Sequence, residues 1–168
     1  MTPEFVLAQP EHLETIVDIY NQSIPPRNIT ADLTPVTVSQ RKAWFEAHWQ
    51  NPRYPLWVIV QEEQILGWFS VSAFYGRIAY QATAEISIYL DHLAQGKGLG
   101  KRIIRFVQEK MPELGINTLL AFIFKGNAPS LHLFAKEGFV HWGELPNVAN
   151  METHLESLVI LGYQIPQE

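Results

Sequence analysis

The chain contains no cysteine among its 168 residues. Disulfide bonds, thiol nucleophiles and thiolate metal sites are therefore excluded. Basic residues are also scarce, with 12 Lys and Arg against 17 Asp and Glu and a formal net charge of −5. Because nucleic acids and anionic membrane surfaces select basic proteins, we expect neither as a partner. The six histidines are scattered without the spacing of metal ligands, so we expect no bound metal.

Long hydrophobic runs are missing as well, and no segment is apolar for long enough to cross a bilayer. The first ten residues lack both a basic start and an apolar run, so no signal peptide is indicated. Hydrophobic residues make up 47% of the sequence and charged residues 17%, which favours a folded globular protein over disorder. We expect a soluble, cytoplasmic protein with a single domain over residues 1–168.

Hydrophobic periodicity predicts alternating strands and helices. Strands are expected at 5–8, 56–61, 65–73, 82–90, 118–124, 139–142 and 155–161, and helices at 10–24, 39–48, 99–111 and 128–136. Ser39 is the expected N-cap of the second helix, and Pro112 and Gly115 are expected to end the third. The polar stretch 27–38 is expected to be a long connection. This order predicts a mixed α/β fold, a mostly antiparallel central sheet flanked by helices.

A glycine-rich turn separates the expected strand at 82–90 from the helix that follows. It reads Gln95-Gly96-Lys97-Gly98-Leu99-Gly100-Lys101. Glycine permits positive φ and close approach of a ligand, and the first amides of a helix are unpaired at the positive end of its dipole. The turn therefore favours a phosphate or pyrophosphate site, to which Lys97 and Lys101 add charge. A tight turn whose glycines serve geometry alone is the alternative.

Two other phosphate-binding loops do not match this turn. The P-loop requires Ser or Thr directly after its lysine, whereas Gly100 is followed by Lys101-Arg102. The dinucleotide fingerprint requires G-x-G-x-x-G after the first strand, whereas the spacing here is G-x-G-x-G and lies later in the chain. A second segment, residues 126–139, places Asn127 at a helix start, where it is equally compatible with an ordinary N-cap.

The two segments together resemble the GNAT superfamily of N-acetyltransferases. The resemblance is carried by Q-G-K-G-L-G after an apolar strand and by N-A-P-S-L-H-L-F-A-K-E-G-F downstream, and it runs from Phe5 to Leu161. Segments 19–21, 43–47 and 85–90 resemble its phosphinothricin and methionine-sulfone acetyltransferase branch. The resemblance implies the GNAT fold, acetyl-CoA as cosubstrate and direct acetyl transfer to the amine of a small, amino-acid-like molecule. A homodimer, common in the branch, is also implied.

The resemblance further implies which residues contact the cofactor. Backbone groups of the 88–90 segment would pair with the pantetheine arm as an extra strand does, and the glycine-rich turn would cradle the pyrophosphate. Lys136 is equally compatible with a solvated helix surface. The implied cofactor-binding set is Ile88, Tyr89, Leu90, Gln95, Gly96, Lys97, Gly98, Leu99, Gly100, Lys101, Asn127, Ser130 and Lys136.

A carboxylate is needed because an alkylammonium must lose a proton before its nitrogen can attack a thioester. Glu85 interrupts an otherwise apolar strand and matches the family's catalytic carboxylate, so we predict that it is the general base. From its strand position alone, an outward-facing residue is slightly favoured. A backbone amide in the same strand would stabilise the oxyanion. No covalent acetyl-enzyme is expected, because cysteine is absent and no serine lies in a recognisable nucleophile turn.

Several positions depart from the family pattern. Phe134 stands where the family often has Tyr, and the branch often His, to protonate the leaving thiolate; phenylalanine cannot do so. Tyr75 replaces an Arg of the branch, and Ala82 stands in place of a His. We predict that Phe74, Tyr75 and Arg77 bind the acceptor in an altered pocket, with Arg77 restoring one cation. The segment 148–152 also lacks the basic charge of the branch.

Three alternatives remain beside small-molecule acetyl transfer. A non-catalytic acyl-CoA-binding sensor is supported by Phe134. A protein or peptide N-acetyltransferase would need an open groove, whereas the aromatic-rich segments suggest a closed pocket. A nucleotide hydrolase is disfavoured because the P-loop and a metal-ligand cluster are lacking.

Overall fold

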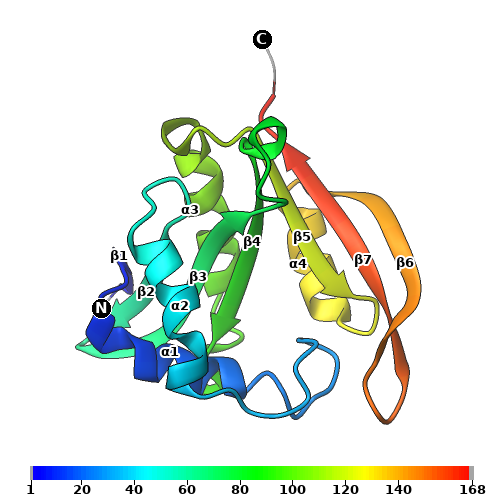
Figure 1. The fold of residues 1–168 in the computed structure, drawn as a ribbon, viewed down its shortest axis with the longest axis horizontal. Coiled ribbons are helices and arrows are strands. Elements are labelled where there is room, and N and C mark those ends of the chain that lie inside the picture. Colours follow the sequence, from blue (N-terminus) through cyan, green and yellow to red (C-terminus); the bar gives the residue numbers. More distant parts are fainter. Residues whose placement is uncertain (1, 167–168) are drawn as a thin grey trace.

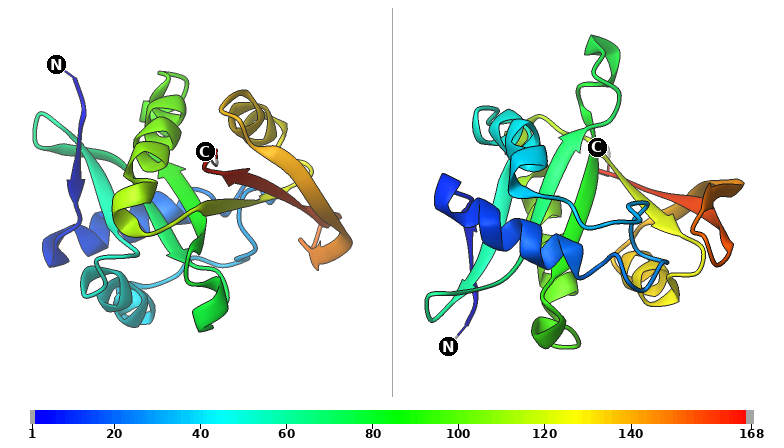
Figure 2. Two further views of the ribbon diagram at one scale, coloured as in Figure 1. Left: turned by 90° about the horizontal axis from the view of Figure 1, so that it is seen from above. Right: turned by 60° about the horizontal axis from the view of Figure 1, so that its bottom comes forward.

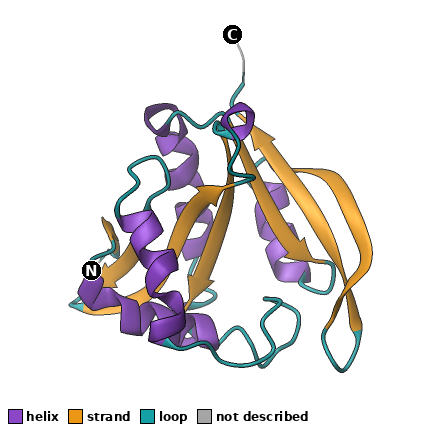
Figure 3. Ribbon diagram, in the orientation of Figure 1, coloured by secondary structure: helices purple, strands orange, loops and turns teal. Residues whose placement is uncertain are grey.

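The computed structural model describes residues 2–166 as one seven-stranded sheet with helices on both faces (Figures 1 and 3). The strands are β1 (Glu4–Leu7), β2 (Leu56–Gln61), β3 (Gln64–Ala73), β4 (Thr83–Leu90), β5 (Thr118–Phe124), β6 (Val140–Asn150) and β7 (Leu155–Gln164). The helices are α1 (Leu13–Asn21), α2 (Val38–Trp49), α3 (Leu99–Leu114) and α4 (Ala128–Lys136), with short 3-10 helices η1 (Pro10–His12), η2 (Ile78–Tyr80) and η3 (His92–Ala94). The strand order is β1-β2-β3-β4-β5-β7-β6, and only β4 and β5 run parallel. The predicted mixed, mostly antiparallel α/β fold is confirmed.

Helices lie on both faces of the sheet (Figure 2), and an apolar layer holds them against it on each face. Strand residues alternate between faces, so each strand supplies both layers. Val71, Ala84 and Leu119 point to the α3 and α4 side and are fully buried there. Val58 and Trp68 point to the α1 and α2 side, where Trp68 Nε1 also donates to the Ile16 carbonyl at 3.0 Å. Polar residues on this second face are therefore noteworthy, since they interrupt a packed layer.

Strands β4 and β5 separate along their length (Figure 1). Their parallel pairing covers only Thr83–Glu85 against Thr118–Leu120. From there β5 stays paired with β7, whereas β4 stays paired with β3 as far as Leu90. The β5-facing backbone of residues 86–90 therefore has no strand partner in the sheet, and the separation begins beside Glu85.

Several expected boundaries were wrong. Thr37, not Ser39, caps α2, because its hydroxyl accepts from Gln40 N while the Gln40 side chain bonds back to Thr37 N. Helix α3 continues through Pro112, contrary to expectation, and ends at the predicted Gly115, whose φ is +71°. At the other end of the chain β6 runs to Asn150, eight residues beyond the expected Trp142, because it pairs with β7 across two irregularities in register. The segment 148–152 is therefore largely strand, and α1 ends at Asn21, short of residue 24.

None of the helices in the described residues 2–166 is long and apolar enough to span a membrane.

Candidate active site

The glycine-rich turn leads directly into α3. Gly96 has φ +76° and Gly98, the N-cap of α3, has φ +77°. A Cβ added at either would meet no atom within 4 Å, so the positive φ alone is what favours glycine there. Gly98 offers no side chain to cap the first amides of α3, which leaves them available to an anion. The predicted turn-helix geometry is present.

Gly100 has a different role from its neighbours. A Cβ there would lie 2.6 Å from Leu133 Cδ2 in α4, so this glycine permits α3 and α4 to approach. Lys97 and Lys101 are exposed and form no ion pair with any other described residue. Leu99 is buried and anchors the first turn in the core. Lys97 and Lys101 therefore place two positive charges, unpaired among the described residues, at the N-terminus of α3, which Leu99 anchors in the core.

The residues predicted to pair with pantetheine lie on β4 where β5 has separated. Ile88 and Leu90 pack toward α3, and Tyr89 packs toward α1 with its ring 5.0 Å from that of Tyr20. Gln95 Nε2 reaches the Leu90 carbonyl at 3.5 Å, which joins this strand to the turn. Residues 88–90 and the start of α3 thus lie close to each other. Both carry unpaired backbone groups, on the β5-facing edge of β4 and in the first turn of α3.

Asn127 is the N-cap of α4, and its Oδ1 accepts from Ser130 N at 3.4 Å. The ordinary cap therefore accounts for part of this side chain, and contact with a cofactor stays a prediction for both residues. Lys136 lies at the opposite end of α4 and is exposed. The structure does not bring Lys136 together with the start of that helix, and its cofactor role also stays a prediction.

The loop before α4 is fixed from two directions that the sequence did not reveal. The Gly126 N–H donates to Glu156 Oε1 at 2.9 Å, and the Gly126 carbonyl accepts from Asn28 Nδ2 at 3.3 Å. Glu156 lies on β7, is buried, and its other oxygen lies 2.7 Å from His154 Nε2. The sequence signal for this anchor is the presence of a carboxylate, Glu156, in an otherwise apolar strand.

Glu85 is the last β4 residue paired with β5, and its Cα partners are Ser72 on β3 and Leu120 on β5. Its side chain points to the α1 and α2 face, because Ala84 and Ile86 point to the other face. Burial raises the pKa of the Glu85 carboxyl. Within residues 2–166, no group donates a hydrogen bond to this carboxylate. It is a half-buried acceptor, available to an incoming donor, where the two strands part.

Aromatic rings close over β4 on this same face. Phe74 follows β3, Phe122 lies on β5, and their rings stack with centroids 6.5 Å apart. Because β4 lies between those two strands, the ring pair crosses the strand that carries Glu85. Tyr75 is 68% exposed, with its ring 5.6 Å from Phe74, and Arg77 is exposed just before η2. Of the three predicted acceptor residues, only Phe74 is brought to β4 by a contact with β5.

The connection between α1 and α2 lies beside this face and is held by polar contacts. Tyr20 hydroxyl bonds to Thr30 Oγ1 at 2.6 Å and to Asp32. Arg41 pairs with Asp32 at 3.3 Å, and its guanidinium lies 4.6 Å from the centre of the Tyr20 ring. Burial raises the pKa of the Tyr20 hydroxyl, so it remains a donor at neutral pH. The long loop is therefore ordered, as a loop that walls a site must be.

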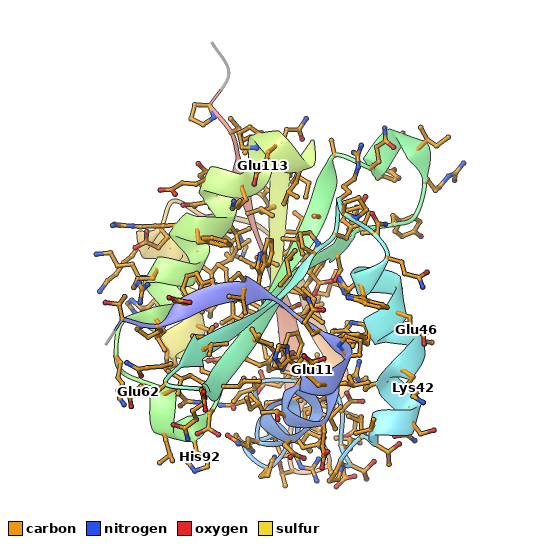
Figure 4. All side chains as sticks on the ribbon, turned by 90° about the vertical axis from the view of Figure 1, so that its left-hand side faces the viewer. Glu11, Lys42, Glu46, Glu62, His92 and Glu113 are labelled. Atoms are coloured by element: carbon orange, nitrogen blue, oxygen red, sulfur yellow. The ribbon has the colours of Figure 1, made fainter. Side chains whose placement is uncertain are left out.

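Another polar pair lies on the same face. His48 is buried in the last turn of α2, whose outer side carries Lys42 and Glu46 (Figure 4). His48 Nδ1 lies 2.7 Å from the Tyr54 carbonyl, and Nε2 lies 3.2 Å from Ser72 Oγ. The sequence did not indicate this contact, because its partners come from three separate segments.

Comparison with known proteins agrees with this geometry. The acetyltransferase (GNAT) family matches residues 14–139. YwnH of Bacillus subtilis, which carries a provisional phosphinothricin acetyltransferase name, is 44% identical over 95% of this chain and 97% of its own. An L-methionine sulfoximine/L-methionine sulfone acetyltransferase of Pseudomonas paraeruginosa is 31% identical over 81% of this chain and 79% of its own.

A solved structure extends the likeness to three dimensions. The phosphinothricin acetyltransferase of Sinorhizobium meliloti, in complex with acetyl-CoA, superimposes with a TM-score of 0.91 at 26% identity, covering 98% of this chain and 89% of its own. The predicted family and fold are thereby confirmed. The chain belongs to the GNAT family of acetyltransferases, in the branch of phosphinothricin and methionine sulfoximine acetyltransferases, and is an N-acetyltransferase.

Proposed function

We propose that this chain transfers the acetyl group of acetyl-CoA to the primary amine of a small, amino-acid-like molecule, with Glu85 as general base. The observation that carries the proposal is the Glu85 carboxylate, which is half-buried, receives no hydrogen bond from the described residues, and lies where β4 and β5 separate. A group in this position can accept a proton from a ligand that enters between the strands.

The residues present fit acetyl-CoA. Unpaired β4 backbone at 88–90 can bond an extended pantetheine arm, and the α3 amides beyond Gly98 with Lys97 and Lys101 can bind a pyrophosphate. The turn residues Gln95 to Lys101 therefore form the proposed cofactor set with Ile88, Tyr89, Leu90, Asn127, Ser130 and Lys136. Acetyl-CoA bound to the Sinorhizobium relative supports this assignment.

The acceptor side supports a compact amine. Phe74 stacks on Phe122 across β4, and Tyr75 and Arg77 extend the same loop, so we assign Phe74, Tyr75 and Arg77 to acceptor binding. The names of the relatives point to phosphinothricin, L-methionine sulfone and L-methionine sulfoximine as the first acceptors to test.

The reaction balances without a covalent enzyme intermediate. Glu85 takes one proton from the acceptor ammonium, and the freed nitrogen forms a bond to the thioester carbonyl carbon as the carbon–sulfur bond breaks. A β4 backbone amide beyond Glu85 stabilises the oxygen as its charge grows. The products are the N-acetyl compound, coenzyme A with its thiol, and one proton, which Glu85 returns to solvent. As the amide forms, the nitrogen loses its second proton to solvent. Solvent also supplies the thiol proton, because Phe134 has none to give.

We further propose that residues 1–168 act as a single domain, that the protein forms a homodimer, and that it works in the cytoplasm. Light scattering coupled to size-exclusion chromatography measures the assembly directly, and a monomer mass would overturn the dimer.

The test is release of free thiol from acetyl-CoA with a panel of amines. We expect turnover with at least one amino-acid-like acceptor and its loss in Glu85→Gln. A second candidate is an acyl-CoA sensor. Phe134 favours it, because this side chain is 5% exposed, packs 4.9 Å from the Phe139 ring centre and has no proton to give to a leaving thiolate. Tight acetyl-CoA binding with no turnover on any amine, unchanged by Glu85→Gln, would establish the sensor. Acetylation of peptides but not of free amino acids would establish a peptide acetyltransferase.

A further inference from the structure

The hydrogen bonds around His48 define its protonation. The Tyr54 carbonyl can only accept, so His48 Nδ1, 2.7 Å away, carries a hydrogen. Burial lowers the pKa of His48, so the ring is neutral at pH 7 and its Nε2 bears a lone pair. Ser72 Oγ, 3.2 Å from that nitrogen, therefore donates its hydrogen to His48. The direction of the Ser72 hydroxyl is fixed by a residue 24 positions away.

A hydroxyl held in this way can only accept from a third group. Ser72 donates its single hydrogen to His48, so only its lone pairs remain for other hydrogen bonds. Ser72 and Glu85 are directly opposite each other in the β3–β4 register and share the α1 and α2 face, where the β-carbons of opposite residues lie about 5 Å apart. Two hydrogen-bond acceptors, one charged and one neutral, thus lie side by side.

The charged and polar groups around Ser72 and Glu85 bond to other residues and not to these two acceptors. On α1, Tyr20 bonds to Thr30 and Asp32, and on α2, Arg41 pairs with Asp32. Tyr89, on β4 itself, is half-buried, and desolvation raises its pKa, so it stays neutral. Within residues 2–166, neither a carboxylate nor a cation forms an ion pair with His48 or Glu85. Among residues 2–166, no group donates a hydrogen bond to Glu85 or to the remaining lone pairs of Ser72, so both acceptors are open to an incoming donor.

We propose that Ser72, oriented by His48, is the second acceptor for the ammonium group of the substrate, beside Glu85. This inference rests on the proposed function and names the machinery that positions its amine. An alkylammonium has three N–H donors. Glu85 binds one and later takes its proton, while Ser72 binds a second and keeps the neutral amine in place. Because the amine stays held at Ser72 after Glu85 has taken its proton, the nitrogen can turn its freed lone pair from Glu85 toward the thioester carbonyl without leaving the site. His48 is a positioning residue, since it acts through Ser72.

Four variants and one double variant test the proposal, with L-methionine sulfone as acceptor probe and free thiol as readout. Ser72→Ala should raise the KM of the amine about tenfold, the usual effect of losing a hydrogen bond to a charged group, and leave the KM of acetyl-CoA unchanged. His48→Leu should do the same. His48→Gln should recover most of the loss, because Gln can accept from Ser72, and Ser72→Thr should too, because Thr keeps the hydroxyl.

The double variant separates positioning from packing. If His48 acts only through Ser72, then Ser72→Ala with His48→Leu should raise the amine KM no more than Ser72→Ala alone. Additive effects, an unchanged amine KM in Ser72→Ala, or an equal loss in His48→Gln and His48→Leu would each overturn the proposal. A parallel rise in the KM of acetyl-CoA would also overturn it.

The proposal can fail separately from the proposed function. If Glu85→Gln abolishes turnover while Ser72→Ala leaves the amine KM unchanged, the base stands and the second acceptor falls. If L-methionine sulfone is not acetylated at all, calorimetry of its binding in the presence of coenzyme A replaces the kinetics. Binding about tenfold weaker in Ser72→Ala supports the proposal, and equal or absent binding in wild type and variant overturns it.

Discussion

The proposed cofactor side and the proposed acceptor side of β4 are built by different means. The core of the proposed cofactor side is the consecutive stretch from Ile88 to Lys101, and its character depends on backbone conformation, with positive φ at Gly96 and Gly98. The proposed acceptor side is assembled from remote segments by side-chain contacts, such as that of His48 with Ser72, which are 24 residues apart. Changes on the first side should therefore act through backbone strain, and changes on the second through lost hydrogen bonds.

Glu85, where the two sides meet, should give the largest effect. We expect Glu85→Gln to lower kcat/KM for the amine by about 10²- to 10⁴-fold, the usual contribution of a general base. Because burial raises the pKa of Glu85, the wild-type kcat/KM should fall with decreasing pH at a higher pH than for an ordinary glutamate. That limb should vanish in Glu85→Gln. A pH profile at saturating acetyl-CoA measures both, and an identical limb in the variant would assign the titration to another group.

The contrast also explains how much the sequence could reveal. The alternation of 82–90 and the glycine spacing at 96–100 are local, so they predicted β4, the turn and α3 correctly. Helix ends were less predictable, because Thr37 and Ser39 are equally good caps until Gln40 closes the box with Thr37. Of the two predicted ends of α3, Pro112 does not stop the helix, whereas Gly115 does, because it adopts positive φ and Ile116 N bonds to the Met111 carbonyl.

The sequence could not predict contacts between segments that lie far apart in the chain. In the sequence, His48 is one of six scattered histidines without a recognisable role, and the fold brings its ring to Ser72. Glu156 likewise reads as an ordinary polar residue of a strand, yet it is 6% exposed and bonds to Gly126. The strand expected at 139–142 extends to Asn150 as β6, because β6 pairs with β7 across an irregular register that the sequence does not show.

The Glu156 anchor of the loop before α4 should give the next largest effect. Glu156→Ala removes the acceptor for Gly126 N, which leaves a partly buried donor unpaired and should cost about 1–3 kcal/mol of unfolding free energy. The loop that positions Asn127 should loosen, so the KM values of both substrates should rise. Denaturant unfolding and steady-state kinetics measure these changes.

Glu144 provides a matched control. It pairs with Lys125 at 3.3 Å, near the same loop, but with the lysine mostly exposed. Glu144→Ala should therefore change the unfolding free energy by less than about 1 kcal/mol. Equal destabilisation by the two variants would show that the Gly126 contact has no special importance.

Two glycines with the same backbone conformation can separate the two sides directly. Gly98 and Gly76 have φ of +77° and +68°, and an added Cβ meets nothing within 4 Å at either. Alanine at each should cost about 1 kcal/mol of stability through strain alone. Gly98→Ala should raise the KM of acetyl-CoA several-fold, whereas Gly76→Ala, in the loop of Tyr75 and Arg77, should change only the KM of the amine. Both variants acting on one substrate would break the division between the sides.

The smallest expected effect is on stability and again concerns Glu85. Its pKa is raised in the folded protein, so the folded state holds the proton more tightly than the unfolded chain, whose carboxyl titrates near 4.5. This stabilisation is present at low pH and is lost as pH rises through the raised pKa. Glutamine does not ionise, so Glu85→Gln should be more stable than wild type at pH 8, with the difference closing toward pH 4.

Glu46 is the control for that measurement, because it is exposed on the outer side of α2 (Figure 4). Glu46→Gln should leave the pH dependence of the unfolding free energy unchanged. Denaturant melts of wild type and both variants between pH 4 and pH 8 give the comparison. A stability gain in Glu85→Gln that is the same at every pH would mean that packing, and not the buried charge, sets the cost of this carboxylate. If the gain grows with pH, the charge that Glu85 needs for its proposed role as base is also what destabilises the fold around it.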